Sequence, residues 1–477
     1  MITLCPDLKP EHFAPQISKL WEASASKILS IDAAETPGAA TPVFTIEGKY
    51  TARGWTEWTQ GFVYGSAILQ YDATGDEKFL TMGRDRTRDR MAHHITHIGV
   101  HDHGFNNVST YGNLLRLMVE GRIPDDDGEK AFYELALKCS GAVQAARWTP
   151  IAGGGGYIYS FNGPHSLFAD TIRSLRALSV SHALGHVLMG EQDLRISLLG
   201  RLLDHARATS KYAVYYGEGR DAYDERGRTA HESVFNLNDG NFRCPNSQQG
   251  YSPFTTWTRG QSWIMAGYPE QLEWIDTLAD SEFEPFGGRS AVEELLLKPA
   301  LAACDHFIAE TPTDGIPYWD TGAPNLHKLG DYRNKPAQIE NDFEPVDSSA
   351  AAIAAQGLLR LGHYLEGKDD ARGEKYWQAG LTVADTVLAE PYLSTDPNHE
   401  GLILHSIYHR PNGWDHIPQG SKIPRGESSM WGDYHARELA LYLQRLIENK
   451  PYYTFFGGVQ AVAPQNPQGA ERPARSS

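Results

Sequence analysis

The feature that most constrains this chain is a helical period of apolar residues that recurs along almost its whole length. Apolar side chains return every three or four positions, the spacing of one buried face on a helix. Continuous strand patterns are scarce, although Tyr212–Tyr216 is a short piece that could pair locally. Amphipathic stretches cover residues 12–30, 58–73, 77–97, 107–120, 129–147, 170–189, 193–209, 258–278, 290–309, 347–365, 372–389 and 429–447. The sequence therefore predicts an all-α protein of about twelve helices.

Three similar segments indicate that these helices are joined as hairpins. Each runs from a helix through a glycine-containing turn into a charged helix start, and the turn glycines are Gly75, Gly190 and Gly367. Glycine supplies the left-handed residue that ends a helix, and acidic residues suit the start of the next one. Six hairpins closed into a ring would bury every apolar face as an (α/α)6 toroid, whereas an open solenoid is the competing arrangement. The unequal spacing of the repeats favours the toroid, as one catalytic domain over 1–460 with a disordered tail over 461–477.

The charge of the chain limits its partners. The formal net charge is −17, and nucleic acid or an acidic membrane would need clustered Lys and Arg instead. A few cationic side chains in a pocket would still admit an anionic small molecule. No apolar run reaches transmembrane length, and the first residues lack the pattern of a signal peptide, so we expect a cytoplasmic protein. The four cysteines are far apart and form no CxxC pair, which argues against a disulfide framework.

A cluster of histidines is the first candidate for chemistry. His93, His94, His97, His101 and His103 lie within one short segment, and His93 and His97 have the spacing of a zinc pair on a helix. No HExxH motif and no nearby cysteine completes a ligand set. Histidines that cap a helix end and bond to loop carbonyls are the favoured interpretation, so no metal is expected.

Two aspartates form the second candidate. Asp170 directly precedes TIRSLRAL, where a helix N-cap is the ordinary role of an aspartate. Asp102, before His103 and Gly104, is equally suited to a turn. Together, however, they would supply the pair of carboxylates that glycosidic chemistry commonly needs.

The segment WTRGQSW (257–263) places a cation and aromatic rings close together. At helical spacing Arg259 and Trp263 share one face, which suits a stacking platform beside a charge, although a buried Trp with a surface Arg is almost as good an interpretation. Three further segments are unusual but have structural interpretations as caps, core or close packing: GIPYWDTGAP (315–324), EPVDSSAAAIAAQGLL (344–359) and GESSMWGDY (426–434).

Taken together, the motifs resemble the unsaturated glucuronyl hydrolases, glycoside hydrolase family 88. The matching blocks, in order, are WTQGF (58–62), HDHGF (101–105), ADTIRSL (169–175), AHESVF (230–235), QQG (248–250), WTRGQSW (257–263), IPYWD (316–320), DSSAAAIAAQGLL (347–359) and ESSMWGDY (427–434). Each block is weak alone, but their order across residues 50–447 is specific. The resemblance implies an (α/α)6 barrel, which agrees with the helical pattern.

The resemblance also implies a reaction and its residues. The family removes a 4,5-unsaturated uronate from the non-reducing end of an oligosaccharide by protonating C4 and adding water at C5. Asp170 resembles the general acid and base, and Asp102 resembles the second essential carboxylate. The resemblance also implies that residues in the other blocks bind the substrate and that neither a metal nor an organic cofactor takes part. These binding residues are His231 and Gln249, which contact the uronate or the attacking water, and Arg259, Trp263, Trp58 and Ser348.

Other functions stay open from the sequence. An unsaturated rhamnogalacturonyl hydrolase would share the fold and the chemistry, although WTRGQ and DSSAAAI favour the glucuronyl class. A sugar 2-epimerase would use the histidines, and a sugar-binding protein without catalysis would need neither aspartate. The decisive observation is whether Asp102 and Asp170 face one cavity together with His231, Gln249 and Arg259. The parent polysaccharide is not specified by the sequence.

Overall fold

Each of the amphipathic stretches contains helix in the computed structural model, which describes residues 1–35, 40–53 and 57–459. The expected tail, 461–477, lies outside these ranges. One set of helices is buried on one face only and forms an outer layer. These outer helices are α1 (Ala14–Ala34), α3 (Glu77–Arg90), α6 (Asp127–Ala146), α9 (Leu198–Tyr212), α11 (Arg289–Glu310) and α13 (Gly373–Val387).

The helices between them in sequence form an inner ring. Inner helices are buried on nearly all sides, and in α10 every residue is buried. The inner set is α2 (Gln60–Thr74), the π-helical η3 (Gly104–Gly112) with α5 (Asn113–Val119), α7 (Thr171–Ser174) with α8 (Arg176–Ala183), α10 (Thr258–Ile275), α12 (Ser348–Glu366) and α14 (Met430–Ile447).

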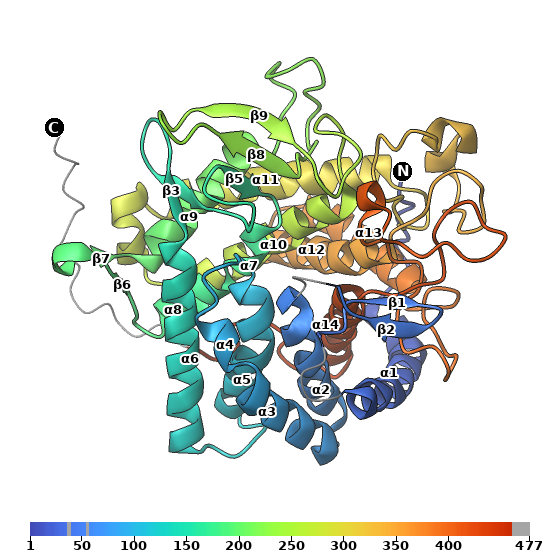
Figure 1. Ribbon diagram of the computed structural model, residues 1–477, viewed down its shortest axis with the longest axis horizontal. Helices are drawn as coiled ribbons and strands as arrows, with labels where there is room; N and C mark the ends of the chain where they lie inside the picture. The colour runs from blue at the N-terminus through green and yellow to red at the C-terminus, as the bar shows by residue number, and fades with distance from the viewer. Residues whose placement is uncertain (36–39, 54–56, 460–477) are drawn as a thin grey trace.

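Contacts between neighbours close the inner ring. α2 contacts η3, η3 contacts α7 and α8, α7 and α8 contact α10, α10 contacts α12, α12 contacts α14, and α14 returns to α2. In Figure 1 α10, α12 and α14 lie at the centre of the view, whereas α1, α3 and α6 lie toward its edge. Six inner and six outer units alternate through the described ranges, so the predicted (α/α)6 barrel is confirmed and the open solenoid is excluded.

Of the three turn glycines expected to be left-handed, one adopts that conformation. Gly75 ends α2 with φ 70°, and Asp76 caps α3 by accepting a hydrogen bond from the Lys78 amide at 3.2 Å. Gly190 and Gly367 are not left-handed, with φ −98° and −62°. Gly185 (φ 76°) and Asp369 (φ 56°) adopt that conformation instead.

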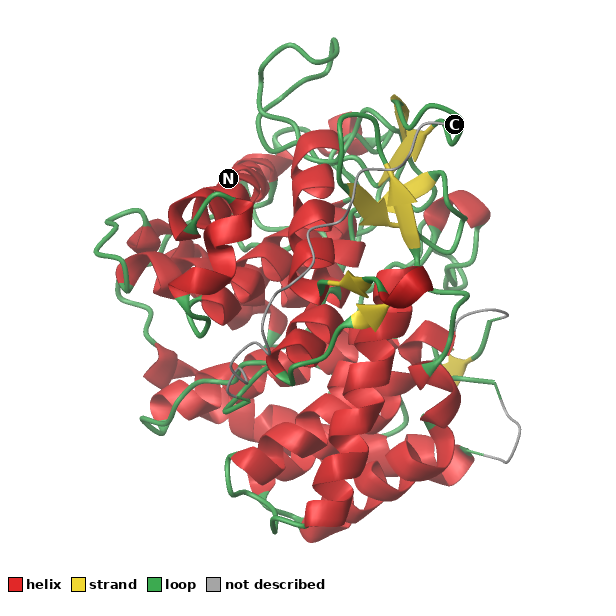
Figure 2. Cartoon of the chain, turned by 90° about the vertical axis from the view of Figure 1, so that its left-hand side faces the viewer, coloured by secondary structure: helices red, strands yellow, loops and turns green. Residues whose placement is uncertain are grey.

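Short antiparallel strands lie in the connections between the helices of the barrel. Figure 2 shows how little strand accompanies the helices. The β5–β8–β9 sheet pairs Leu167 with Ser233 and Val234 with Cys244. Residues 212–216 form no strand, although Val214 makes one isolated bridge with Thr229. The strands are β1 (Phe44–Ile46), β2 (Lys49–Thr51), β3 (Trp148–Pro150), β4 (Gly156–Ile158), β5 (Ser166–Phe168), β6 (Leu188–Met189), β7 (Arg195–Ile196), β8 (Glu232–Phe235) and β9 (Phe242–Asn246).

Four buried charges join inner helices beneath the loops. Arg173 and Arg176 each pair with both Glu270 of α10 and Glu438 of α14, and all four side chains are at most 1% exposed. A buried arginine is tolerated when its charge and its N–H groups find partners. The short helix α7 is therefore fixed to two neighbours across the ring. Within the described ranges, no helix is both long and apolar enough to cross a membrane.

Candidate active site

A cavity of about 400 Å³ opens where the inner helices begin. Trp58, Asp102, Asp170 and Arg259 reach it from the starts of α2, η3, α7 and α10. Because hairpins alternate direction, the inner helices all start at this end of the barrel. The first N–H groups of a helix lack partners within it and carry partial positive charge. This end of the molecule is therefore suited to an anionic ligand, despite the negative net charge.

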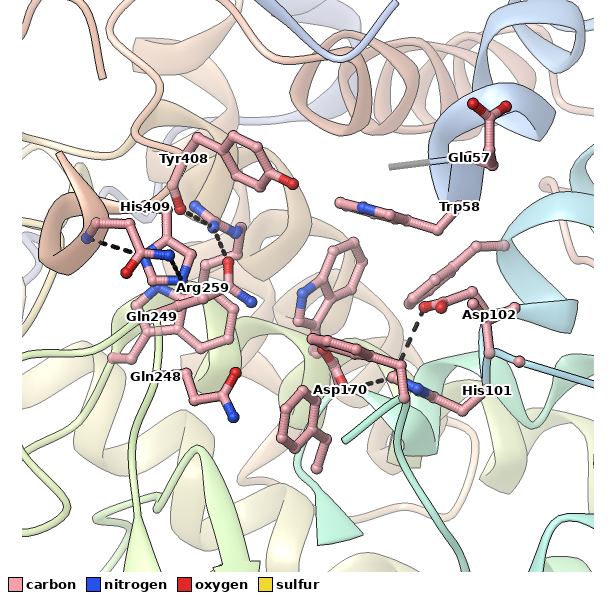
Figure 3. Close-up of a pocket in the computed structure, with 18 of the residues that line it drawn as sticks. Glu57, Trp58, His101, Asp102, Asp170, Gln248, Gln249, Arg259, Tyr408 and His409 are labelled. Atoms are coloured by element: carbon pink, nitrogen blue, oxygen red, sulfur yellow. Dashed lines mark hydrogen bonds and ion pairs between the residues drawn. The ribbon is translucent and has the colours of Figure 1, made fainter. Parts of the chain in front are cut away.

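Asp102 and Asp170 lie on two sides of one histidine (Figure 3). His101 Nε2 is 3.2 Å from Asp170 Oδ1 and 3.7 Å from Asp102 Oδ1. Both carboxylates are largely buried, at 7% and 8% exposed. The sequence suggested this pair but gave no distance, and it did not single out His101 as their shared neighbour.

Close packing of glycine brings the two aspartate loops together. The Gly104 amide donates a hydrogen bond to Ser174 Oγ at 3.1 Å, and a Cβ at Gly104 would collide with the Ser174 carbonyl oxygen. Ser174 Oγ and Gln144 Nε2 also donate hydrogen bonds to the His101 carbonyl, at 2.6 and 2.7 Å. The glycine of HDHGF is thus needed for the approach of η3 to α7.

Asp170 precedes α7 at the N-cap position, but its side chain does not act as the cap that was its alternative structural interpretation. Asp170 precedes α7 with helical dihedral angles, φ −70° and ψ −22°, and its side chain accepts no hydrogen bond from the helix amides. N-cap residues usually have extended angles and accept from the second or third amide. The carboxylate is turned toward His101 instead, so its position serves the cavity and not the helix end.

The surroundings of the two aspartates shift their pKa values in opposite directions. Burial and the negative charge of Asp170 raise the pKa of Asp102 to about 6, against the opposing charge of His101. Burial acts to raise the pKa of Asp170 as well, but the charge and hydrogen bond of His101 outweigh it and hold that pKa below the ordinary value. The raised pKa therefore belongs to Asp102 in the free protein.

Arg259 is held by acceptors on every side. Its guanidinium pairs with Asp347 at 2.9 Å and donates to Gln249 Oε1 at 2.8 Å and to the Tyr408 carbonyl at 2.7 Å. Because Gln249 Oε1 accepts from Arg259, the amide NH₂ of Gln249 is the group left to donate toward the cavity. Asp347 also caps α12, as the sequence suggested.

His231 lies behind the cavity wall and not on it. Its Nδ1 accepts hydrogen bonds from the amides of Gln248 and Gln249 at 3.0 and 3.3 Å. The ring proton must then be on Nε2, which is buried and has no hydrogen-bond partner among the described residues. Burial lowers the pKa of His231 to about 4. The side chain is a neutral N–H donor near Asp170.

The remaining predicted residues divide between the wall and the core. Trp58 and Trp263 line the cavity, and Trp58 stacks on the buried Trp431 with ring centroids 5.1 Å apart. Ser348 does not line it: the side chain is fully buried and lies against Ser406. Its position directly after the Asp347 cap places it inside the start of α12.

Several cavity residues were not expected from the sequence. Tyr408, His409, Asn412 and Trp414 belong to one segment before α14, Phe168 ends β5, and Glu57, Phe161 and Gln248 come from other connecting segments. The aromatic density of HSIYHRPNGW (405–414) was the available signal. Loops carry no helical period, so periodicity did not find them.

Two further histidines of the cluster, His94 and His103, have structural partners. His103 bonds to Ser140 Oγ and to the His97 carbonyl, both at 3.0 Å, and His94 bonds to Gln60 and Asn106. Across residues 1–35, 40–53 and 57–459, no group of three His, Cys, Asp or Glu side chains is arranged to hold a metal ion.

An α/α barrel whose open end holds two carboxylates among aromatic rings has the architecture of a glycoside hydrolase. No protein-family model matches the chain, but named relatives do, and the resemblance to unsaturated glucuronyl hydrolases is confirmed. The chain is 28% identical over 409 residues to the unsaturated glucuronyl hydrolase of Bacillus sp. (strain GL1), across 83% of this chain and 89% of that protein. It is 23% identical to the unsaturated chondroitin disaccharide hydrolase of Streptococcus pneumoniae, across 84% of each chain.

Solved structures agree on the fold. The crystal structure of unsaturated glucuronyl hydrolase from Bacillus sp. GL1 superposes with a TM-score of 0.67 at 22% identity, covering 91% of this chain and 97% of that one. An unsaturated glucuronyl hydrolase specific for heparin gives the same TM-score at 19% identity, covering 91% and 98%.

Proposed function

We propose that this protein hydrolyses the bond between a terminal 4,5-unsaturated uronate and the next sugar of an oligosaccharide. The observation that carries the proposal is the pair of buried carboxylates, Asp102 and Asp170, on one histidine within an aromatic-walled cavity. A small anionic substrate suits this end of the barrel. The relatives named above are an unsaturated glucuronyl hydrolase and an unsaturated chondroitin disaccharide hydrolase.

The substrate is a vinyl ether, because the C4=C5 double bond adjoins the ring oxygen. Asp170 delivers a proton to C4, positive charge develops at C5, and water adds there. The proton that water loses returns to Asp170. The product is a hemiketal, which opens and releases the neighbouring sugar. A general acid and base placed in this way contributes roughly 10²–10⁴-fold to a rate.

The other residues bind and orient. Trp58 offers an aromatic ring to a sugar, and Trp263 closes the wall beside it. The amide NH₂ of Gln249 is available for the uronate carboxylate or the attacking water, and His231, behind the wall, holds the Gln248 and Gln249 amides through Nδ1. Asp347 pairs with Arg259, and Arg259 orients Gln249 by donating to its Oε1. Asp102 places a second carboxyl group beside Asp170, and its raised pKa of about 6 favours the uptake of a proton when the anionic substrate arrives.

Disaccharides produced by polysaccharide lyases provide the test. The ultraviolet absorbance of the C4=C5 bond should disappear with stoichiometric release of the second sugar, and saturated glucuronides should be inert. An epimerase or a binding protein would leave the absorbance unchanged. Loss of absorbance without sugar release, or equal turnover of saturated substrates, would contradict the proposal. A panel with glucuronyl and rhamnogalacturonan-derived disaccharides separates the two sister activities.

A further inference from the structure

His101 lies between the two carboxylates of the site. It is 2% exposed, and the same ring nitrogen, Nε2, approaches both Asp170 Oδ1 and Asp102 Oδ1. A lone pair on Nε2 would face two oxygen atoms that also carry lone pairs, which is repulsive. Nε2 therefore carries a hydrogen, and it donates to Asp170 over the shorter of the two distances. The backbone is equally fixed, because the His101 carbonyl accepts two hydrogen bonds from buried side chains.

In the described part of the chain, the two aspartates are the anionic side chains that act on His101. The other ionisable groups around it are neutral or cationic. His103, His205 and His231 are neutral, since burial lowers their pKa values to about 3, 3 and 4. Arg147 is the one nearby cation and opposes a charge on His101, but its guanidinium donates to the carbonyls of Tyr159 and Ser160. Burial lowers the pKa of His101 too, and the two carboxylates outweigh it, so this pKa lies above its ordinary value.

We propose that His101 is a positioning residue that supplies Asp170 with the proton destined for C4. This inference rests on the proposed function. The N–H bond at Nε2 breaks, an O–H bond forms at Asp170 Oδ1, and the imidazolium–carboxylate pair becomes a neutral pair. An anionic uronate next to Asp170 favours this transfer, because a like charge disfavours the carboxylate form. After Asp170 protonates C4, it recovers a proton from the attacking water. This proton passes back to His101 Nε2 when the anionic product leaves, and the original imidazolium–carboxylate pair is restored.

This arrangement explains how a carboxyl with a lowered pKa can act as an acid. The titrating unit is the Asp170–His101 pair, which keeps one proton until the pH exceeds the raised pKa of His101. Asp170 draws on that proton when substrate is present. Without His101, the proton would have to remain on a carboxylate alone, and it would be lost at a lower pH.

The variant His101→Gln tests the proposal kinetically. Glutamine keeps an N–H donor of comparable reach but cannot titrate. We expect kcat/KM at pH 7 to fall about 10-fold or more, and the basic limb of its pH profile to move to lower pH by roughly one unit. His93→Gln, an exposed histidine of the same segment, should match the wild type. A folded His101→Gln protein with the wild-type profile would overturn the proposal, since a merely structural hydrogen bond would be preserved.

Histidine NMR titration gives a second readout that needs no substrate. In the wild type, one buried histidine should remain protonated above pH 6.5, and in Asp170→Asn its pKa should fall, because burial then dominates. An unchanged titration in Asp170→Asn would contradict the inference. This comparison decides the matter even if His101→Gln does not fold. It also separates the inference from the proposed function: failure to cleave any unsaturated disaccharide would overturn the function while leaving the proton pairing measurable.

Discussion

Glu438 Oε2 accepts a hydrogen bond from Arg173 Nη2 at 2.9 Å, joining the short helix after Asp170 to the last helix of the inner ring. Glu438 also pairs with Arg176 and accepts from the Tyr453 hydroxyl. The two arginines hold the pKa of Glu438 well below its usual range, although burial alone would raise it. The contact lies three residues from Asp170 in sequence, so the stability of the barrel and the placement of the acid are linked.

Glu438→Gln should destabilise the protein by about 3–5 kcal/mol, because two buried arginines lose one of the two anions that they share. The lowered pKa means that this stabilisation is present at neutral pH and is lost as acid protonates Glu438. Chemical denaturation at pH 7 measures the change. Glu448→Gln, near the end of the same helix and pairing with exposed Lys450, should change stability by less than about 1 kcal/mol. Equal effects of the two variants would contradict this assignment.

Asp170→Asn should fold as the wild type does, since the Asp170 side chain makes no capping hydrogen bond. Its turnover of an unsaturated disaccharide should fall by about 10²–10⁴-fold, because the asparagine amide cannot deliver a proton to C4. Asp127→Asn, an exposed aspartate on α6, serves as the control. Near-native turnover by a folded Asp170→Asn protein would transfer the role of donor to Asp102.

Asp102→Asn should impair turnover yet stabilise the fold at neutral pH. The pKa of Asp102 is raised to about 6 by burial, so its ionisation above that pH works against the folded state. One pKa unit corresponds to about 1.4 kcal/mol, and we expect a gain of about 1–3 kcal/mol. The gain should be largest above pH 6 and shrink as the pH falls toward 4. Melting curves at pH 8 and pH 5 provide the measurement, and a gain that does not vary with pH would count against the raised pKa.

Chelator treatment should leave the rate unchanged. His94 and His103 use both ring nitrogens in hydrogen bonds with protein groups. Neither ring therefore has a free nitrogen to act as a metal ligand. Assay after prolonged dialysis against a chelator tests this. A loss of activity that added metal restores would assign the histidine cluster to catalysis.

The sequence by itself determined the helices and their order. A period of 3.6 residues is a local property, visible in any stretch of a dozen residues, and it located every inner and outer helix. The ends were less exact: the stretch predicted as 170–189 ends in strand β6, and the one predicted as 193–209 contains strand β7 near its start. The turns were less predictable. Gly75 matched its expected conformation, whereas Gly185 and Asp369 replaced Gly190 and Gly367, because the residue that becomes left-handed depends on where each helix stops packing.

Site residues could be assigned where their sequence blocks matched a family, and the cavity brings Asp102, Asp170, Gln249, Arg259, Trp58 and Trp263 together. Ser348 and His231 show the limit of that reasoning, since one is enclosed at a helix start and the other stands behind the wall. A motif specifies residue types along the chain, but exposure to a cavity depends on neighbours from distant segments.

Only the tertiary structure decided the protonation of the site. Asp102 and Asp170 are 68 positions apart, and their contact with one nitrogen of His101 arises where Gly104 lets two inner helices approach. The helical pattern is encoded by neighbours in sequence, whereas a pKa depends on burial and on charges that folding gathers from across the ring. For that reason the sequence proposed two aspartates, and the fold determined which one binds its proton more tightly and which one is held as an anion by His101.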